Sequence, residues 1–238
     1  MFSTRILQVC AVLSLILGTA VRGDEKSEWT QLFNGKDLTG WKLHPNPHPD
    51  IKDLEEKKVD GKVVAFEAMV KEKKVPLWRV VDGTIIGGGP PSHLFSERGD
   101  YADFHYRIEA KINDKGNSGQ YFRTAFGPGF PTGYEAQINA THGDKVKTGS
   151  LYPDPRTTLK NHKDKITVLN TAAHKPDEYF TQEVIAIGSK ITIIVNDKKT
   201  LEWEDPDGLY KKGHFALQAH DPGSVMTFRK IEVKEIKK

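Results

Sequence analysis

The chain has 238 residues, of which 37% are hydrophobic and 28% are charged, and its formal net charge is +3. This length fits one large domain, and the apolar content is sufficient for a core. The net charge is small, lysines and arginines are scattered, and the sequence holds no nucleic-acid-binding motif, so nucleic acid is excluded as an expected partner.

The N-terminal segment has the pattern of a secretory signal peptide. Arg5 provides a positive start, and residues 6–17 form an apolar stretch that is too short to predict a membrane span. Residues 18–20 are the small residues Gly, Thr and Ala, which a signal peptidase accepts at its cleavage site. The pattern therefore predicts export.

Cleavage is expected after Ala20 or, alternatively, after Gly23. We accordingly expect residues 1–23 to be a signal peptide and residues 24–238 to be a secreted or periplasmic domain without a membrane span. The single cysteine, Cys10, lies in the leader, so the mature domain has no disulfide, thiol nucleophile or thiolate metal site.

The first part of the mature chain reads as turns and a surface insertion. Residues 44–58 are rich in proline and then in charge, and residues 53–58 are predicted to form one or two helical turns. His44 and His48 are expected to be solvated, since they lie in a flexible loop. Residues 87–91 (Gly-Gly-Gly-Pro-Pro) read as a turn, because no helix follows to bind phosphate.

The remaining chain alternates apolar and polar residues with the period of β-strands. Residues 104–111 alternate in this way, and residues 184–195 form two apolar runs separated by the turn signal Gly188-Ser189. Residues 225–236 read as a final edge strand protected by outward lysines and glutamates. Many strands separated by turns predict an all-β fold, a jelly-roll β-sandwich of two antiparallel sheets.

Three of these strands carry polar groups of an unusual kind on one face; they are residues 119–124, 133–139 and 214–220. Side chains of a strand alternate between its faces, so Glu135, Gln137 and Asn139 share one face. By the same rule Gln218 and His220 share a face. Amides, imidazoles and a carboxylate bind hydroxyls and carbonyls, so the pattern favours a sugar-binding face over an ordinary solvated one.

Several blocks of the sequence resemble the 3-keto-disaccharide hydrolase family; they are residues 32–41, 116–119 with Tyr121 and Arg123, 134–138, 148–152 and 213–222. The resemblance covers nearly all of the mature chain in order. It implies a jelly roll like that of concanavalin A lectins and glucanases, export, and sugar chemistry. The sequence departs from the family at Tyr179-Phe180, where many members have Trp-Asn, and we expect this strand to lie at the margin of a cleft.

Two reaction types remain open. Ordinary glycosidases need two carboxylates, but the strand at 135–139 offers only Glu135, so a partner such as Asp221 would have to come from another element. In a 3-keto sugar the ketone acidifies the neighbouring C–H, and the glycosidic bond can break by elimination followed by hydration. This route needs one base, an electrophile near the ketone and a proton donor.

For this route we predict three catalytic residues. Glu135 is the expected base, with a histidine as the alternative, Arg123 would polarise the ketone, and His220 would donate the proton. The alternatives are that Arg123 only pairs with Glu135 and that His220 only caps the turn at residues 221–223. A substrate-binding role is predicted for six further residues: Asn117, Tyr121, Gln137, Tyr152, Gln218 and Asp221.

No cofactor is required by the sequence. A divalent metal held by Glu135, His142, His220 and Asp221 remains an alternative, although no closely spaced motif supports it. We expect an exported hydrolase that acts on a small carbohydrate, with a non-catalytic carbohydrate-binding module as the main alternative. Arg123, Glu135, Gln137, Gln218 and His220 should line one concave sheet face, opposite the core residues Tyr134, Ile138, Phe215 and Leu217.

Overall fold

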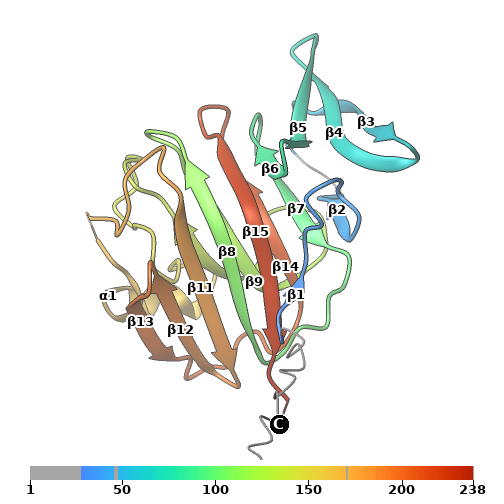
Figure 1. Ribbon diagram of the computed structural model, residues 1–238. Helices are drawn as coiled ribbons and strands as arrows, with labels where there is room; N and C mark the ends of the chain where they lie inside the picture. The colour runs from blue at the N-terminus through green and yellow to red at the C-terminus, as the bar shows by residue number, and fades with distance from the viewer. Residues whose placement is uncertain (1–27, 46–47, 170, 238) are drawn as a thin grey trace, which may run out of the picture.

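The computed structural model describes residues 28–45, 48–169 and 171–237, and it is a sandwich of two antiparallel sheets (Figure 1). The larger sheet has ten strands, in the order β13 (Lys198–Glu204), β12 (Lys190–Val195), β11 (Phe180–Ile187), β8 (Phe104–Ile112), β15 (Met226–Glu235), β6 (Thr84–Gly87), β5 (Lys73–Val81), β4 (Lys62–Val70) and β3 (Lys52–Val59), with β1 (Thr30–Gln31) also paired to β15. The all-β jelly-roll prediction is confirmed.

The smaller sheet has five strands, in the order β10 (Thr132–Ile138), β9 (Ser118–Ala125), β14 (His214–Ala219), β7 (Ser92–Ser96) and β2 (Trp41–Leu43). Between β10 and β11 the chain forms a short 3-10 helix (Thr158–His162) followed by α1 (Lys163–Ile166). None of the helices in the described ranges is long and apolar enough to cross a membrane. The predicted signal peptide lies outside the described residues.

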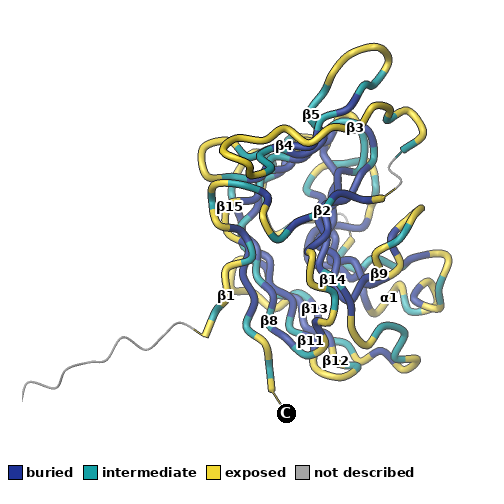
Figure 2. Tube along the Cα trace, turned by 90° about the vertical axis from the view of Figure 1, so that its right-hand side faces the viewer, coloured by how far each residue is buried: buried dark blue, intermediate teal, exposed yellow. Residues whose placement is uncertain are grey.

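The core lies between the two sheets, where the buried trace is concentrated (Figure 2). Alternation places Phe104, Tyr106 and Ile108 of β8 on the inner face of the larger sheet, and all three are fully buried. They meet the inner face of the smaller sheet, where the Tyr106 ring stacks on Phe215 with centroids 4.0 Å apart. Tyr134, Ile138, Phe215 and Leu217 are core residues, as the sequence predicts.

Two predictions from the sequence, one of an edge strand and one of a helical segment, differ from the structure. The last strand, β15, is not at an edge, because it pairs with β8 on one side and with β6 on the other. Residues 53–58 are not helical but belong to β3, which is exposed along its whole length. Their helix-favouring side chains are overridden by pairing with β4 through the turn at Asp60 and Gly61, both with positive φ.

Candidate active site

A small pocket opens on the outer face of the smaller sheet, and we call it the Glu135 pocket. Tyr134, Ala136 and Ile138 point into the core, so Glu135 and Gln137 point outward. The lining side chains come from four places in the sequence: Asn117, Phe130, Glu135, Gln137, Asp144, Tyr152, Gln218 and His220. The volume is about 50 Å³, which can hold a substituent of a sugar but not its ring.

Six of the nine predicted site residues therefore meet at one place: Asn117, Glu135, Gln137, Tyr152, Gln218 and His220. The other three do not line it. Tyr121 lies beneath the pocket with its ring only 1% exposed, and Asp221 is bonded to His220. The expectation that Glu135, Gln137, Gln218 and His220 share one face is confirmed, and the expectation for Arg123 is wrong.

Arg123 lies at a bulge of β9, where two residues of this strand oppose one on each neighbour. Its φ is +49°, and the count of alternating faces breaks there. The guanidinium is turned away from the pocket and donates to the carbonyl oxygens of Ala102 at 2.7 and 2.9 Å and of Gly188 at 2.6 Å. It therefore ties loops together and neither pairs with Glu135 nor faces a substrate there.

Glu135 is a buried carboxyl with one side-chain donor, the Tyr121 hydroxyl, at 2.7 Å from Oε2. Tyr121 in turn accepts a hydrogen bond from Nε2 of Gln218 at 3.0 Å. Burial raises the pKa of Glu135 to about 8, and the Tyr121 hydrogen bond only partly opposes this shift. At neutral pH the protonated form of Glu135 therefore prevails, which suits a proton donor.

The other carboxylate oxygen needs an open space. A Cβ at Gly119, the β9 residue paired with Gln137, would lie 2.3 Å from Oε1 of Glu135. No side chain fits there, so glycine at position 119 leaves room for the Glu135 carboxyl.

His220 follows β14 directly, and its Nδ1 lies 2.8 Å from Oδ2 of Asp221. Asp221 also accepts from the Ser224 hydroxyl at 2.7 Å and the Gly223 amide at 2.8 Å. Burial opposes ionisation of Asp221, but these hydrogen bonds outweigh it and lower its pKa. In the neutral form of His220, an ionised Asp221 holds the ring proton on Nδ1, so the lone pair lies on Nε2.

This arrangement also tests the alternative role of His220. The turn at residues 221–223 is closed by Asp221, which accepts from the Gly223 amide, and not by the imidazole. His220 is therefore oriented by the turn rather than required to cap it.

Three buried polar atoms around the site have no hydrogen-bond partner within the described part of the chain: Nε2 of His93, Oδ1 of Asn117 and Oε1 of Gln218. His93 and Gln218 are paired residues on β7 and β14, so their side chains lie on the same outer face. An unsatisfied buried polar group costs about 1–3 kcal/mol, so three such groups at one place indicate a position for a polar ligand or water. Tyr106 and Gln120, which also have unpartnered atoms, lie elsewhere, between the sheets.

The candidate metal ligands are only partly brought together. His142, His220 and Asp221 each place one ligand atom within 4.8 Å of the others, and Glu135 does not belong to this group. However, Nδ1 of His142 accepts the Asp144 amide at 3.1 Å, which leaves the proton of the neutral ring on Nε2. Since Asp221 already accepts three hydrogen bonds, the hydrogen bonding of this cluster does not fit a three-ligand site.

Sequence reasoning missed three residues of this region: His93, Phe130 and Asp144. His93 alternates with the core-facing Leu94 in the strand Ser92–Ser96, and this alternation predicts that His93 lies on the outer face of the sheet. Phe130 and Asp144 lie outside the strands, where no periodicity predicts the direction of a side chain. Asn139, expected on the binding face, instead donates to the carbonyl oxygens of Asp144 and Val146 and holds that loop.

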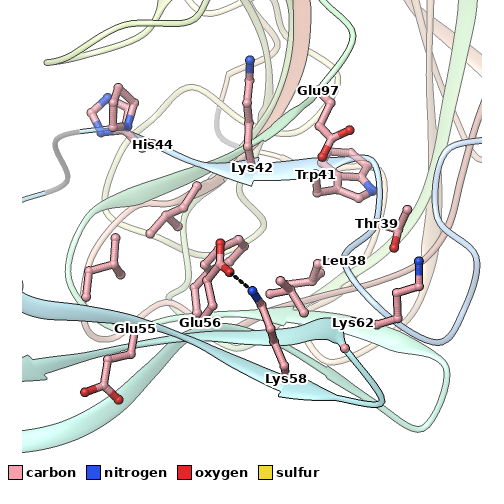
Figure 3. Close-up of a pocket in the computed structure, with 16 residues that line it drawn as sticks. Leu38, Thr39, Trp41, Lys42, His44, Glu55, Glu56, Lys58, Lys62 and Glu97 are labelled. Atoms are coloured by element: carbon pink, nitrogen blue, oxygen red, sulfur yellow. Dashed lines mark ion pairs between the residues drawn. The ribbon is translucent and has the colours of Figure 1, made fainter.

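A larger groove of about 620 Å³ lies between β2 and the β3–β4 hairpin (Figure 3). Glu56 and Lys58, which line it, pair at 2.9 Å, and the ammonium of Lys42 lies 3.9 Å from the centre of the Phe126 ring. His44 at its end is buried, contrary to expectation, with Nε2 bonded to the Gly129 carbonyl oxygen at 2.7 Å. We therefore assign the site to the Glu135 pocket and not to this groove.

Residues 28–234 match the model of a family described as the 3-keto-alpha-glucoside-1,2-lyase-like domain. The chain belongs to this family. Membership makes it a carbohydrate-active protein of glycoside-hydrolase type. The departure from the family at Tyr179-Phe180 does not lie at the Glu135 pocket, because Phe180 begins β11 of the larger sheet and Tyr179 packs against Arg229.

Solved structures share the fold at low sequence identity. Two proteins of Parabacteroides distasonis, each described as a "putative glycosyl hydrolase", are 21% and 19% identical, with TM-scores of 0.62 and 0.60. The alignments cover 88% and 87% of this chain and 94% and 99% of those chains. A pseudo beta-1,3-glucanase of Mycobacterium tuberculosis is 9% identical, with a TM-score of 0.53 over 88% of this chain and 98% of that one. No curated protein matches the sequence.

Proposed function

We propose that this protein cleaves the glycosidic bond of a small 3-keto-glycoside by elimination, with water added afterwards. The observation that carries the proposal is the pairing of one buried carboxyl, whose pKa is raised to about 8, with a histidine fixed by an aspartate at the same pocket. The protonated carboxyl can give a proton, and the imidazole in its neutral form can take one at Nε2, and concerted acid–base chemistry needs both groups.

In the proposed reaction Nε2 of His220 removes the proton from C2, which the C3 ketone has acidified. The electrons of the C2–H bond form a C1=C2 double bond, the C1–O bond breaks, and the leaving oxygen takes the proton of Glu135. This assignment reverses the roles expected from the sequence, because burial favours the protonated form of Glu135 and the Asp221 hydrogen bond places the lone pair of the neutral His220 ring on Nε2.

The ketone oxygen gains negative charge in this reaction and needs hydrogen-bond donors. Arg123 is not available, but the amides of Asn117 and Gln137 line the pocket. Oε1 of Gln137 already accepts the Ile138 amide at 3.1 Å, so the NH₂ group of Gln137 remains for a ligand. We assign the polarising role to these two amides.

Export belongs to the proposal as well. The positive start, apolar stretch and small residues of the leader favour secretion or a periplasmic location, with a mature chain of residues 24–238. N-terminal sequencing of the protein recovered outside the cytoplasm should give Val21 or Asp24 as the first residue, and an intact Met1 would contradict this.

A two-carboxylate mechanism is the main competing reaction, because Asp144 lines the same pocket as Glu135. The test is to incubate the purified mature protein with methyl 3-keto-α-glucoside and with methyl α-glucoside, with and without a chelator. We expect turnover of the keto sugar alone, unaffected by the chelator, since an ordinary C2–H is too weak an acid for a side-chain base.

The variants His220→Ala and Asp221→Asn should reduce turnover, whereas His105→Ala, which removes an imidazole from the larger sheet, should leave it unchanged. Equal turnover of both sugars would favour the two-carboxylate mechanism. Binding of both sugars without cleavage of either would instead favour the carbohydrate-binding module.

A further inference from the structure

Next to the Glu135 pocket lies a second hollow of about 220 Å³, which we call the side pocket. Its walls include His44, His48, Pro49, Pro91, His93 and Phe130. Phe130 lines both pockets, so the two hollows are neighbours on the surface.

The side pocket differs from the Glu135 pocket in chemistry. Two prolines and a phenylalanine ring form much of its wall, and two of its polar residues are engaged within the protein. The Ser92 hydroxyl accepts a hydrogen bond from the Trp78 indole at 3.0 Å, and His44 binds the Gly129 carbonyl oxygen. Burial lowers the pKa of His93 to about 3, so this ring is neutral and contributes an uncharged wall.

The side pocket is also close to the candidate catalytic carboxyl. The His93 ring meets the Tyr121 ring edge-on, with centroids 5.3 Å apart, and Tyr121 donates to Glu135. The Phe130 ring lies 6.3 Å from His93 and 6.4 Å from Tyr121. If the reacting bond of a ligand lies at Glu135, the next ring of that ligand would therefore reach the side pocket.

Phe130 is held in place although it is 49% exposed. The Arg156 guanidinium lies over its ring at 4.1 Å and donates to the carbonyl oxygen of Pro131 at 2.9 Å. Asp154 fixes the same guanidinium with hydrogen bonds to both carboxylate oxygens. On the other side His44 holds Gly129, so the loop is anchored on both sides and the exposed ring is preorganised.

We propose that the side pocket binds the leaving group of the substrate and selects leaving groups with a flat apolar face, which stacks on Phe130. This rests on the proposed function, because it assigns the reacting bond to the Glu135 pocket and the departing group to the side pocket. The unpartnered amide oxygens of Asn117 and Gln218 suit hydroxyl groups, and the uncharged wall suits a ring. Both an aryl group and the apolar face of a second sugar present such a surface.

Binding and turnover are measured separately to test this. Binding of phenyl α-glucoside, maltose and methyl α-glucoside to the full mature protein is followed by calorimetry. These sugars lack the keto group, so binding is read without cleavage. We expect phenyl α-glucoside to bind roughly 2- to 10-fold more tightly than methyl α-glucoside, as one aromatic contact provides. Maltose should lie between them if a sugar ring stacks in the same way, and should match methyl α-glucoside if only an aryl group does.

Phe130→Ala should abolish the preference and Phe130→Tyr should keep it. The matched control is Phe126→Ala, which removes another exposed phenylalanine of the same loop that lines neither pocket. A preference that survives in Phe130→Ala, or that disappears equally in Phe126→Ala, overturns the proposal. Cleavage of 3-keto-glucosides without a phenyl preference would overturn this inference alone, whereas a phenyl preference without any cleavage would overturn the proposed reaction alone.

Discussion

The outward faces of the two sheets carry similar residue types and use them differently. On the larger sheet, Glu183 lies 2.6 Å from Nε2 of His105, and Glu232 pairs with Arg107. On the smaller sheet, the Tyr121 hydroxyl is the one side-chain donor to Glu135 among the described residues, and the amide oxygens of Asn117 and Gln218 have no partner there. Both faces are polar, but on the first face charges satisfy one another and on the second they do not.

The two glutamates show what this difference does to chemistry. The hydrogen bond from His105 lowers the pKa of Glu183 despite partial burial, whereas burial raises the pKa of Glu135 to about 8. Each lies on the outer face of a strand, but the Glu135 carboxyl is the more deeply buried of the two, and Glu183 has a histidine partner. Burial and the hydrogen-bond partner together decide the protonation of each carboxyl.

The largest expected effect is on turnover. Glu135→Gln keeps the size and hydrogen bonding of the side chain but removes the transferable proton, and kcat/KM for a 3-keto-glucoside should fall about 10²- to 10⁴-fold. Glu183→Gln makes the same change on the other face and should leave kcat/KM unchanged. Equal activity of the two variants would show that the difference between the two faces plays no part in catalysis.

The second effect concerns stability against pH. The pKa of Glu135 is raised on folding, so its contribution to the free energy of unfolding is complete below about pH 4.5 and is lost as the pH rises to about 8. The side chain of Glu135→Gln does not ionise, so the variant does not lose stability in this way as the pH rises. Denaturant titrations should show that the variant gains stability relative to the parent between pH 4.5 and pH 9, by roughly 3–5 kcal/mol at most. If the difference in the free energy of unfolding between the variant and the parent is the same at pH 4.5 and at pH 9, Glu135 is ionised at both pH values.

A smaller loss of activity is expected from Gly119→Ala. The added Cβ would lie 2.3 Å from Oε1 of Glu135 and would displace the carboxyl, which should cost about 10²-fold in kcat. Gly127→Ala is the matched control, because a Cβ there meets no atom within 4 Å and its φ is not positive. Full activity in Gly119→Ala would mean that the position of this carboxyl does not matter.

The smallest effects separate stability from activity. Glu232→Gln, on the larger sheet, weakens charge-assisted hydrogen bonds and should lower the free energy of unfolding by about 1.5–3 kcal/mol without changing kcat/KM. Asn117→Ala, at the pocket, removes an amide that is proposed to polarise the ketone and whose oxygen has no partner among the described residues, so kcat/KM should fall while stability hardly changes. Chemical denaturation and steady-state kinetics are measured on both variants. A loss of activity in Glu232→Gln, or a large loss of stability in Asn117→Ala, would contradict the prediction.

The sequence was informative where period-two alternation is unbroken. It placed Glu135, Gln137, Gln218 and His220 on one face because β10 and β14 follow the pleat through these residues. It failed at Arg123, because a bulge changes the alternation without an evident signal in the residues. It also failed at residues 53–58, where pairing with β4 outweighs helix propensity, and at Phe130 and Asp144, whose loops are set by tertiary contacts.

The protonation states were beyond the sequence for a related reason. The proposed role of Glu135 as the proton donor rests on its burial, and the proposed role of His220 as the base rests on the orientation of Asp221. Both depend on contacts between β9, β10, β14 and the turn after β14. Residue types alone suggested the same two groups but exchanged their roles.

The most direct test of the account is to run the reaction of a methyl 3-keto-α-glucoside in D₂O and to read the hydrogen at C2 of the sugar product. Elimination through His220 removes the C2 proton, so the product should carry deuterium at C2 after hydration, or no hydrogen at C2 if the unsaturated sugar is released. Spontaneous enolisation also exchanges the proton at C4, on the other side of the ketone, so C4 is the internal control and should keep its proton. A hydrolysed product that retains its original proton at both carbons would contradict the account and favour direct displacement at C1.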